Sequence, residues 1–422
     1  METNGPSCMR RRLPHGVQDL FPEEAARRRR AEAALRDLFG RWAYEELIPP
    51  TFEYAETLAV GEGPDLAQAM YRFFDREGQT LALRADFTTQ VARMAAGKMS
   101  GRPLPLRLCY IGSVFRYEEP QVGRQREFTQ AGVELVGAHT PAADAEVVAL
   151  AVAALEGVGV RDFQISLGQL ALFRALTDAL PPADLAAVRQ AIDQRNVARL
   201  AAVLDAAGVA DRRRALLAHL PDLVGGPEVL QEARAYGGTV GEAAKWLLQV
   251  YRLLEAYGAG RRVILDLGEV RGTDYYTGIT FRGVAPGLGW PVLSGGRYDG
   301  LIGQFGKPLA AVGFGLGIER ALLVQERQAG RAAAAVPHLA VRGCDHVTCL
   351  ALAQRLREEG YRVEVDVLGL DEAELRAHAG RRGIGHTLSC RDGGTSWLLS
   401  DGREQRPVSP EALLEEMRTW NR

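Results

Sequence analysis

Ten polar residues at or near the ends of expected strands are of types that recognise small charged molecules: Arg84, Asp86, Thr88, Arg116, Gln130, Glu134, Arg271, Tyr275, Tyr276 and Arg320. Carboxylate, amide and hydroxyl oxygens accept hydrogen bonds from an ammonium group, and arginine binds carboxylates and phosphates. An imidazole needs partners for both ring nitrogens, which a carboxylate and a phenol provide. The set therefore suits a free amino acid with a nucleotide bound beside it.

The spacing of Gln130 and Glu134 places both side chains on one side of an expected strand. Residues four apart in a strand share a face because the side-chain period of a strand is two. Gly132 lies between them and carries no side chain. We therefore expect a ligand to lie against the backbone at this glycine.

The surrounding pattern predicts the elements that hold these residues. Strands are expected at 71–75 and 80–84, followed by a helix at 86–94 and a strand pair at 106–117 and 127–137 with a long basic tip. Further strands are expected at 162–167, 263–267, 275–282 and 292–293, and the glycine-rich stretch 313–317 precedes a helix that ends near 327. Residues 169–257 have an apolar period of about 3.6, which predicts a helical insertion.

The last part of the chain has a different pattern. Residues 337–422 alternate between strand and helix signals, which predicts a small α/β domain. We therefore expect one domain at 1–327, with its insertion at 169–257, then a linker at 328–336 and the C-terminal domain at 337–422.

Four ordered stretches resemble a known family. Residues 110–134 resemble the second class-defining motif of histidyl-tRNA synthetases, and residues 271–281 resemble their histidine-binding motif. Residues 294–301 resemble a further family motif, and 313–320 are similar to the third class motif, whose arginine holds a nucleotide phosphate. The opening stretch 13–22 is also similar. The resemblance implies an α+β, class II aminoacyl-tRNA synthetase-like fold: an antiparallel sheet flanked by helices, with a helical insertion and a C-terminal domain like an anticodon-binding domain.

Two families share this fold: histidyl-tRNA synthetase, and its paralogue the regulatory subunit of short-form ATP phosphoribosyltransferase, which does not charge tRNA. Synthetases carry Arg-Pro-Glu-Gly-Thr at the position where this chain reads Arg84-Ala-Asp86-Phe-Thr88. Aspartate withdraws the carboxylate by about an ångström, and a misplacement of that size can cost ~10²-fold in rate. The stretch Arg126–Gly132 also resembles the regulatory subunits more than the synthetases. These residues favour the regulatory family.

The charge of the C-terminal domain points the same way. Residues 337–422 hold twelve arginines, no lysine and fourteen acidic residues, a balance of −2. An RNA-binding surface needs a surplus of cations to neutralise phosphates. Many regulatory subunits lack this domain, however, and the chain retains Arg116, Arg271 and Arg320, which a synthetase uses on ATP. An active histidyl-tRNA synthetase is therefore the alternative, and a synthetase-like binding module with neither role is a third possibility.

The resemblance implies a role for each residue in a non-catalytic, histidine-binding subunit without a cofactor. Asp86, Thr88 and Gln130 would hold the α-ammonium, and Arg271 the carboxylate. Glu134 and Tyr276 would contact the imidazole, with Tyr275 beside them. Arg116 and Arg320 would remain from a nucleotide site.

The implied partner is the short-form catalytic subunit, in a hetero-oligomer that the family implies is a hetero-octamer. The family also implies a self-dimer. It does not imply tRNA as a partner. The sequence contains no apolar run of 18 residues, so no membrane span is expected. The seven histidines are scattered, so no metal site is expected. We expect a cytoplasmic protein.

Overall fold

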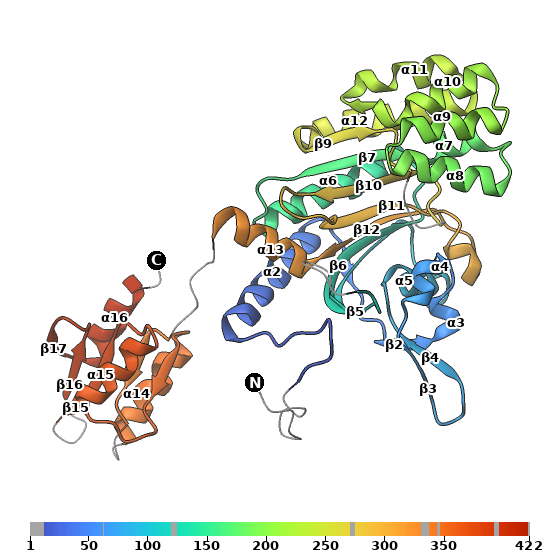
Figure 1. Ribbon diagram of the computed structural model, residues 1–422. Helices are drawn as coiled ribbons and strands as arrows, with labels where there is room; N and C mark the ends of the chain where they lie inside the picture. The colour runs from blue at the N-terminus through green and yellow to red at the C-terminus, as the bar shows by residue number, and fades with distance from the viewer. Residues whose placement is uncertain are drawn as a thin grey trace, which may run out of the picture. The chain divides into compact units, whose positions relative to one another are not determined.

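A computed structural model describes residues 12–61, 63–119, 125–270, 275–330, 337–343, 347–391 and 396–420 (Figure 1). The chain divides into two compact units, Met1–Ala332 and Ala333–Arg422. No helix among the described residues is both long and apolar enough to cross a membrane. No group of three or more metal-ligating side chains occurs among these residues.

A nine-stranded sheet is the centre of the first unit. Its order is β1 (Glu45–Glu46), β5 (Leu106–Phe115), β6 (Glu127–Val136), β12 (Ala311–Gly317), β11 (Leu293–Arg297), β10 (Ile279–Val284), β7 (Gln164–Gln169), β9 (Val263–Asp266) and β8 (Val224–Gly225). The sheet is mixed, since the pairs β1/β5 and β7/β9 are parallel and its other pairs are antiparallel. The expected synthetase-like sheet is confirmed, with these two parallel pairs as a difference.

One face of the sheet is covered by the long helices α2 (Pro22–Arg41) and α6 (Pro141–Gly157) (Figure 1). Pro22 occupies the first turn of α2, and Glu24 accepts a hydrogen bond from the Phe21 backbone N–H at 3.2 Å, which closes that helix end. Val133 and Leu135 of β6 pack in the same apolar core as residues of α2 and α6. The alternate residues of β6 therefore face the other side of the sheet.

That other side is bordered by a small second sheet and a helix. The second sheet has the order β2 (Phe52–Tyr54), β4 (Thr80–Leu83), β3 (Arg72–Phe74), and helix α5 (Thr88–Ala96) follows β4. The predicted strand pair before this helix is confirmed. The predicted strand 275–282 is wrong at its start, because β10 begins at Ile279 and Tyr275 and Tyr276 lie ahead of it in the turn region.

The segment between β7 and β9 is mainly helical, with α7 (Leu170–Thr177), α8 (Pro182–Asp193), α9 (Val197–Ala206), α10 (Asp211–His219), α11 (Gln231–Tyr236) and α12 (Gly238–Ala256). It is not wholly helical, because the two-residue strand β8 pairs with β9 at the sheet edge. Helix α12 packs against α6 and α7, which joins the insertion to the central sheet's helical layer.

The second unit has a five-stranded sheet of order β14 (Val363–Val365), β13 (Leu339–Val341), β15 (Thr387–Arg391), β16 (Ser396–Ser400) and β17 (Gln405–Val408). Its helices are α14 (Val347–Glu358), α15 (Glu372–Arg381) and α16 (Pro410–Trp420). Strand β17 was not expected, because Pro407 weakens the strand signal. Its place at the sheet edge explains why a proline is tolerated there.

Candidate functional site

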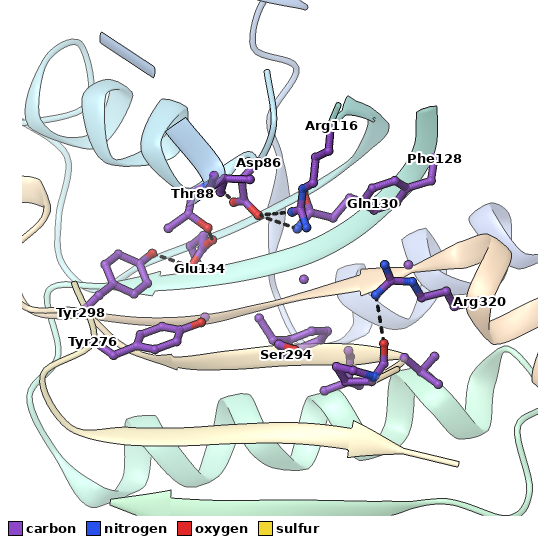
Figure 2. Close-up of a pocket in the computed structure, with 18 of the residues that line it drawn as sticks. Asp86, Thr88, Arg116, Phe128, Gln130, Glu134, Tyr276, Ser294, Tyr298 and Arg320 are labelled. Carbon is purple, nitrogen blue, oxygen red and sulfur yellow. Dashed lines mark hydrogen bonds and ion pairs between the residues drawn. The ribbon is translucent and has the colours of Figure 1, made fainter. Parts of the chain in front are cut away.

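A pocket of about 190 Å³ lies on the face of the central sheet away from α2 and α6 (Figure 2). It is lined by most of the residues predicted from sequence: Asp86, Thr88, Arg116, Gln130, Glu134, Tyr275, Tyr276 and Arg320. Strands β6, β11 and β12 supply residues to its lining, and the start of α5 supplies Thr88. Arg271 lies outside the described residues, so its predicted role stays a prediction.

Glycines of β12 make room for the two polar side chains of β6. Gly313 is paired with Glu134, and a Cβ at Gly313 would lie 1.6 Å from Glu134 Oε2. A Cβ at Gly315 would lie 2.1 Å from Gln130 Nε2. Any side chain at these positions would therefore displace a pocket group, which explains the glycine-rich stretch on this strand.

The expectation that a ligand lies against Gly132 is wrong. Tyr110 is directly opposite Gly132 in the pairing of β5 with β6, and a Cβ on this glycine would lie 2.4 Å from the Tyr110 hydroxyl oxygen. The space above the glycine is filled by this tyrosine. Its ring is itself stacked on Phe87, with ring centroids 4.3 Å apart.

Glu134 is the most deeply buried polar group of the site, with an exposed fraction of 1%. Thr88 donates a hydrogen bond from Oγ1 to Glu134 Oε1 at 2.9 Å, and the Tyr110 hydroxyl lies 3.3 Å from the same oxygen. The Tyr298 hydroxyl is bonded to Oε2. Three hydroxyl groups from three separate elements thus converge on one carboxyl group.

Burial, together with the nearby Asp86 carboxylate and against the lowering effect of the hydroxyl partners, raises the pKa of Glu134 to about 8. Burial also raises the pKa of Tyr110 and Tyr298 well above the usual value. Glu134 therefore holds a proton at neutral pH in the absence of a ligand. This end of the pocket is rich in hydrogen-bonding groups.

Asp86 organises the middle of the pocket. Its Oδ1 accepts from the Thr88 backbone N–H at 2.7 Å, and its Oδ2 accepts from Gln130 Nε2 at 2.9 Å and from Arg116 at 3.3 Å. The other amide atom, Gln130 Oε1, is buried and has no hydrogen-bond partner among the residues that the structure describes. A buried acceptor without a partner costs about 1–3 kcal/mol, so a ligand that donates an N–H here would be favoured.

Two arginines lie at the far end of the pocket from Glu134 (Figure 2). The guanidinium carbons of Arg116 and Arg320 lie 5.2 Å and 5.6 Å from the centroid of the Phe128 ring. Arg116 donates to the Ala85 carbonyl at 2.8 Å, and Arg320 donates to the Pro291 carbonyl at 3.1 Å. This end is positively charged and aromatic, and it suits an anionic or planar group.

The sequence did not predict Phe128, Ser294 and Tyr298, which line the pocket, or Tyr110, which contacts Glu134 without lining it. Ser294 and Tyr298 lie in the family motif at residues 294–301. Because strand side chains alternate, residues 294, 296 and 298 share a face, and this spacing could have predicted that Tyr298 faces the pocket with Ser294. Arg84 does not line the pocket. It is buried beneath, where it donates to the Ser113 and Pro49 carbonyls at 2.7 and 3.0 Å.

Known proteins give the family context. The family model described as histidyl-tRNA synthetase matches residues 16–321. An ATP phosphoribosyltransferase regulatory subunit from Moorella thermoacetica is 44% identical over 377 residues, which cover 88% of this chain and 96% of that protein. The chain belongs to the family of ATP phosphoribosyltransferase regulatory subunits.

Solved structures agree with this family. A Bacillus halodurans protein described as an ATP phosphoribosyltransferase regulatory subunit/histidyl-tRNA synthetase superposes with a TM-score of 0.80 at 30% identity, covering 90% of this chain and 98% of that one. Histidyl-tRNA synthetase from Nostoc sp. PCC 7120 has a TM-score of 0.80 at 20% identity, covering 97% and 99% of the two chains, and shows the shared fold. Regulatory subunits of this family thus have a class II synthetase-like fold.

The contact between Gly313 and Glu134 predicts the effect of a single methyl group. Gly313→Ala should destabilise the protein by about 1–3 kcal/mol, because the buried carboxyl group has to move to accommodate it. Gly101→Ala is the matched control, since no atom of the described part of the chain lies within 4 Å of a Cβ there. Thermal unfolding measures both variants, and an equal melting temperature for the two contradicts the packing described.

The raised pKa of Glu134 predicts a pH dependence of stability. The pKa of Glu134 is 4.5 in the unfolded chain and about 8 in the folded protein. Between these two pH values the folded state therefore holds a proton that the unfolded state has lost. The contribution of Glu134 to stability therefore falls as the pH rises, by at most about 1.4 kcal/mol per unit.

Glu134→Gln removes this titration. Its melting temperature relative to wild type should rise from pH 5.5 to pH 8. Glu45→Gln, at a carboxylate that is 71% exposed, is measured beside it as the control. A difference for Glu134→Gln that is flat or falls with pH would show that this group is ionised throughout.

Proposed function

We propose that this protein acts in histidine biosynthesis as the non-catalytic regulatory subunit of a short-form ATP phosphoribosyltransferase, and that its pocket binds free histidine. The family assignment supports the first part. The second part is supported by one observation above all: Gln130 Oε1, a buried amide acceptor without a partner among the described residues, lies next to the Asp86 carboxylate. Together they suit an ammonium group.

A histidine molecule matches the order of groups along the pocket. Its ammonium would meet Asp86 and Gln130, and its imidazole would meet Glu134 and Tyr276. The carboxylate would point toward the arginine end, to Arg116 and to Arg271, which the resemblance assigns to this group. Thr88 would act indirectly, because its hydroxyl donates to Glu134 and its backbone N–H to Asp86.

Binding histidine in this pocket would allow the complex to sense its end product. Sensing requires that the active and inhibited assemblies bind histidine with different affinity, because a ligand shifts only an equilibrium whose states it binds unequally. The catalytic subunit would be held in a cytoplasmic hetero-oligomer, for which we propose the hetero-octamer implied by the family, built on a self-dimer of this chain. Transfer RNA is not a partner in this proposal.

A second function is favoured by one specific observation. Arg116 and Arg320 line the same pocket as the proposed histidine groups and flank Phe128. An active histidyl-tRNA synthetase would need arginines of this kind to stabilise the charge that develops when the histidine carboxylate attacks the ATP α-phosphate. The pocket would then hold both substrates.

Histidine binding is tested by titration calorimetry on the full chain. The wild type should bind, and Asp86→Asn should weaken binding by about 10- to 100-fold, because a hydrogen bond to a charged group contributes about 1.5–3 kcal/mol. Asp37→Asn on α2, where the carboxylate is 70% exposed, is the control and should bind like wild type. Wild type without measurable binding contradicts the proposed ligand.

The regulatory role is tested with a short-form catalytic subunit. Mixing the two proteins should produce a complex that elutes as one species and forms phosphoribosyl-ATP faster than the catalytic subunit alone, with inhibition by histidine. The purified protein should show no histidine-dependent exchange of pyrophosphate into ATP. Robust exchange, without co-elution or stimulation, would instead establish the synthetase function.

A further inference from the structure

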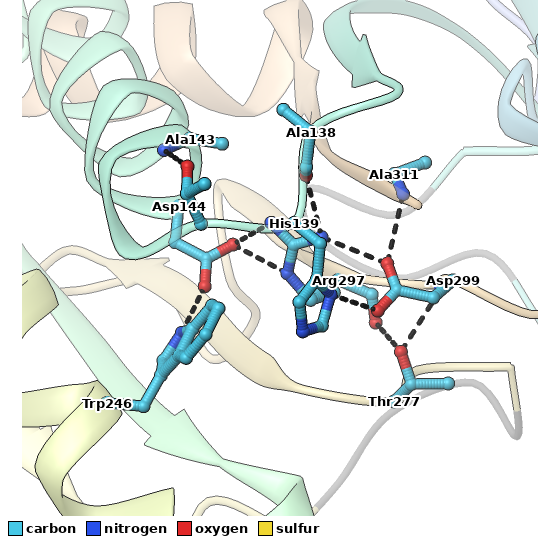
Figure 3. A network of polar contacts seen from close by, with 10 residues as sticks. Ala138, His139, Ala143, Asp144, Trp246, Thr277, Arg297, Asp299 and Ala311 are labelled. Atoms are coloured by element: carbon cyan, nitrogen blue, oxygen red, sulfur yellow. Dashed lines mark hydrogen bonds and ion pairs between the residues drawn. The ribbon is translucent and has the colours of Figure 1, made fainter. Parts of the chain in front are cut away.

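A buried polar network lies on the side of β11 that faces the helices (Figure 3). Arg297 of β11 has an exposed fraction of 1% and Asp144 of α6 one of 0%. Arg297 Nε and Nη2 lie 2.9 Å and 2.7 Å from Asp144 Oδ1. The other oxygen, Asp144 Oδ2, accepts a hydrogen bond from Trp246 Nε1 at 2.7 Å. The ion pair is thus completed by a residue of α12, which belongs to the helical insertion.

The same network reaches the end of β11. Arg297 Nη1 donates to Asp299 Oδ1 at 2.9 Å and to the Ala138 carbonyl at 3.1 Å. Asp299 Oδ1 also accepts from the Ala311 backbone N–H at 3.0 Å. The two residues on either side of Tyr298 are therefore held from the helical side of the sheet.

Tyr298 points the opposite way. Side chains alternate along a strand, so Ser294, Gly296 and Tyr298 face the pocket while Arg297 faces α6. The Tyr298 hydroxyl bonds Glu134, and the Tyr298 backbone N–H donates to the Ala311 carbonyl at 2.8 Å. The position of this hydroxyl depends on the backbone that the network holds.

The network also holds the segment that carries Tyr276. The Thr277 backbone N–H donates to the Arg297 carbonyl at 2.7 Å, and the Asp299 N–H donates to Thr277 Oγ1 at 3.1 Å. Tyr276 is the neighbour of Thr277, and its ring lies 2.9 Å from the position of a Cβ on Gly296. Both tyrosines at the Glu134 end of the pocket are thus attached to one buried network.

We propose that Trp246, through Asp144 and Arg297, is a positioning residue for the pocket and couples the packing of α12 to ligand binding there. Loss of the indole N–H leaves Asp144 Oδ2 without its donor and loosens the guanidinium that holds the end of β11. Tyr298 then bonds Glu134 less well, and the ligand loses a preorganised partner. The inference rests on the proposed histidine pocket.

Titration of the full chain with histidine tests this coupling. Trp246→Phe should weaken binding at least about fivefold, the lower range for coupling between two sites. Thr277→Val, at the other end of the network and of similar volume, should weaken it in the same direction. Trp42→Phe is the control, since Trp42 stacks on Tyr257 at 5.6 Å and has no part in the network. Thermal unfolding identifies any variant that does not fold.

A double-mutant cycle separates positioning from general destabilisation. If Trp246 acts through the pocket tyrosines, the loss of affinity in Trp246→Phe/Tyr298→Phe should be clearly smaller than the sum of the losses in the two single variants. Independent, additive losses would overturn the proposal, as would wild-type affinity in folded Trp246→Phe and Thr277→Val. A wild type that does not bind histidine would contradict the proposed ligand and the coupling together, whereas these other outcomes contradict the coupling alone.

Discussion

The ion pair between Arg297 and Asp144 is the interaction on which the pocket depends. Both side chains are almost completely buried, and removing one partner of such a pair costs about 3–5 kcal/mol because the other charge is left unpaired. The pair joins α6 to β11, and Trp246 joins α12 to the α6 partner, Asp144. A charge placed in an apolar core therefore fixes how the helices lie on the sheet, and with it the strand end that carries Tyr298.

The two faces of the central sheet have different roles: one packs in the core and the other lines the pocket. The helical face is apolar around the Arg297 network, and the other face gathers Asp86, Gln130 and Glu134. Strand alternation makes this division possible, because one strand supplies Val133 to the core and Glu134 to the pocket. The glycines of β12 complete it, since a side chain there would occupy the space of the pocket's own polar groups.

The family and the geometry together explain the mixture of synthetase-like and divergent features. The fold is shared with histidyl-tRNA synthetase, and Arg116, Arg320, Tyr275 and Tyr276 line one pocket, in which the Asp86 carboxylate is engaged by Gln130 and Arg116. The chain belongs to the ATP phosphoribosyltransferase regulatory subunits, whose relatives match it over most of its length.

The sequence by itself determined the class II synthetase-like fold, the strand pairs around residues 71–137 and most of the pocket residues, because alternation, helical period and motifs are local properties. Only the tertiary structure decided that Tyr110 fills the space over Gly132, that Tyr298 bonds Glu134, and that Trp246 completes a buried ion pair. These contacts join residues 22, 164 and 102 positions apart. Their partners are set by strand register and helix packing, which no local pattern specifies.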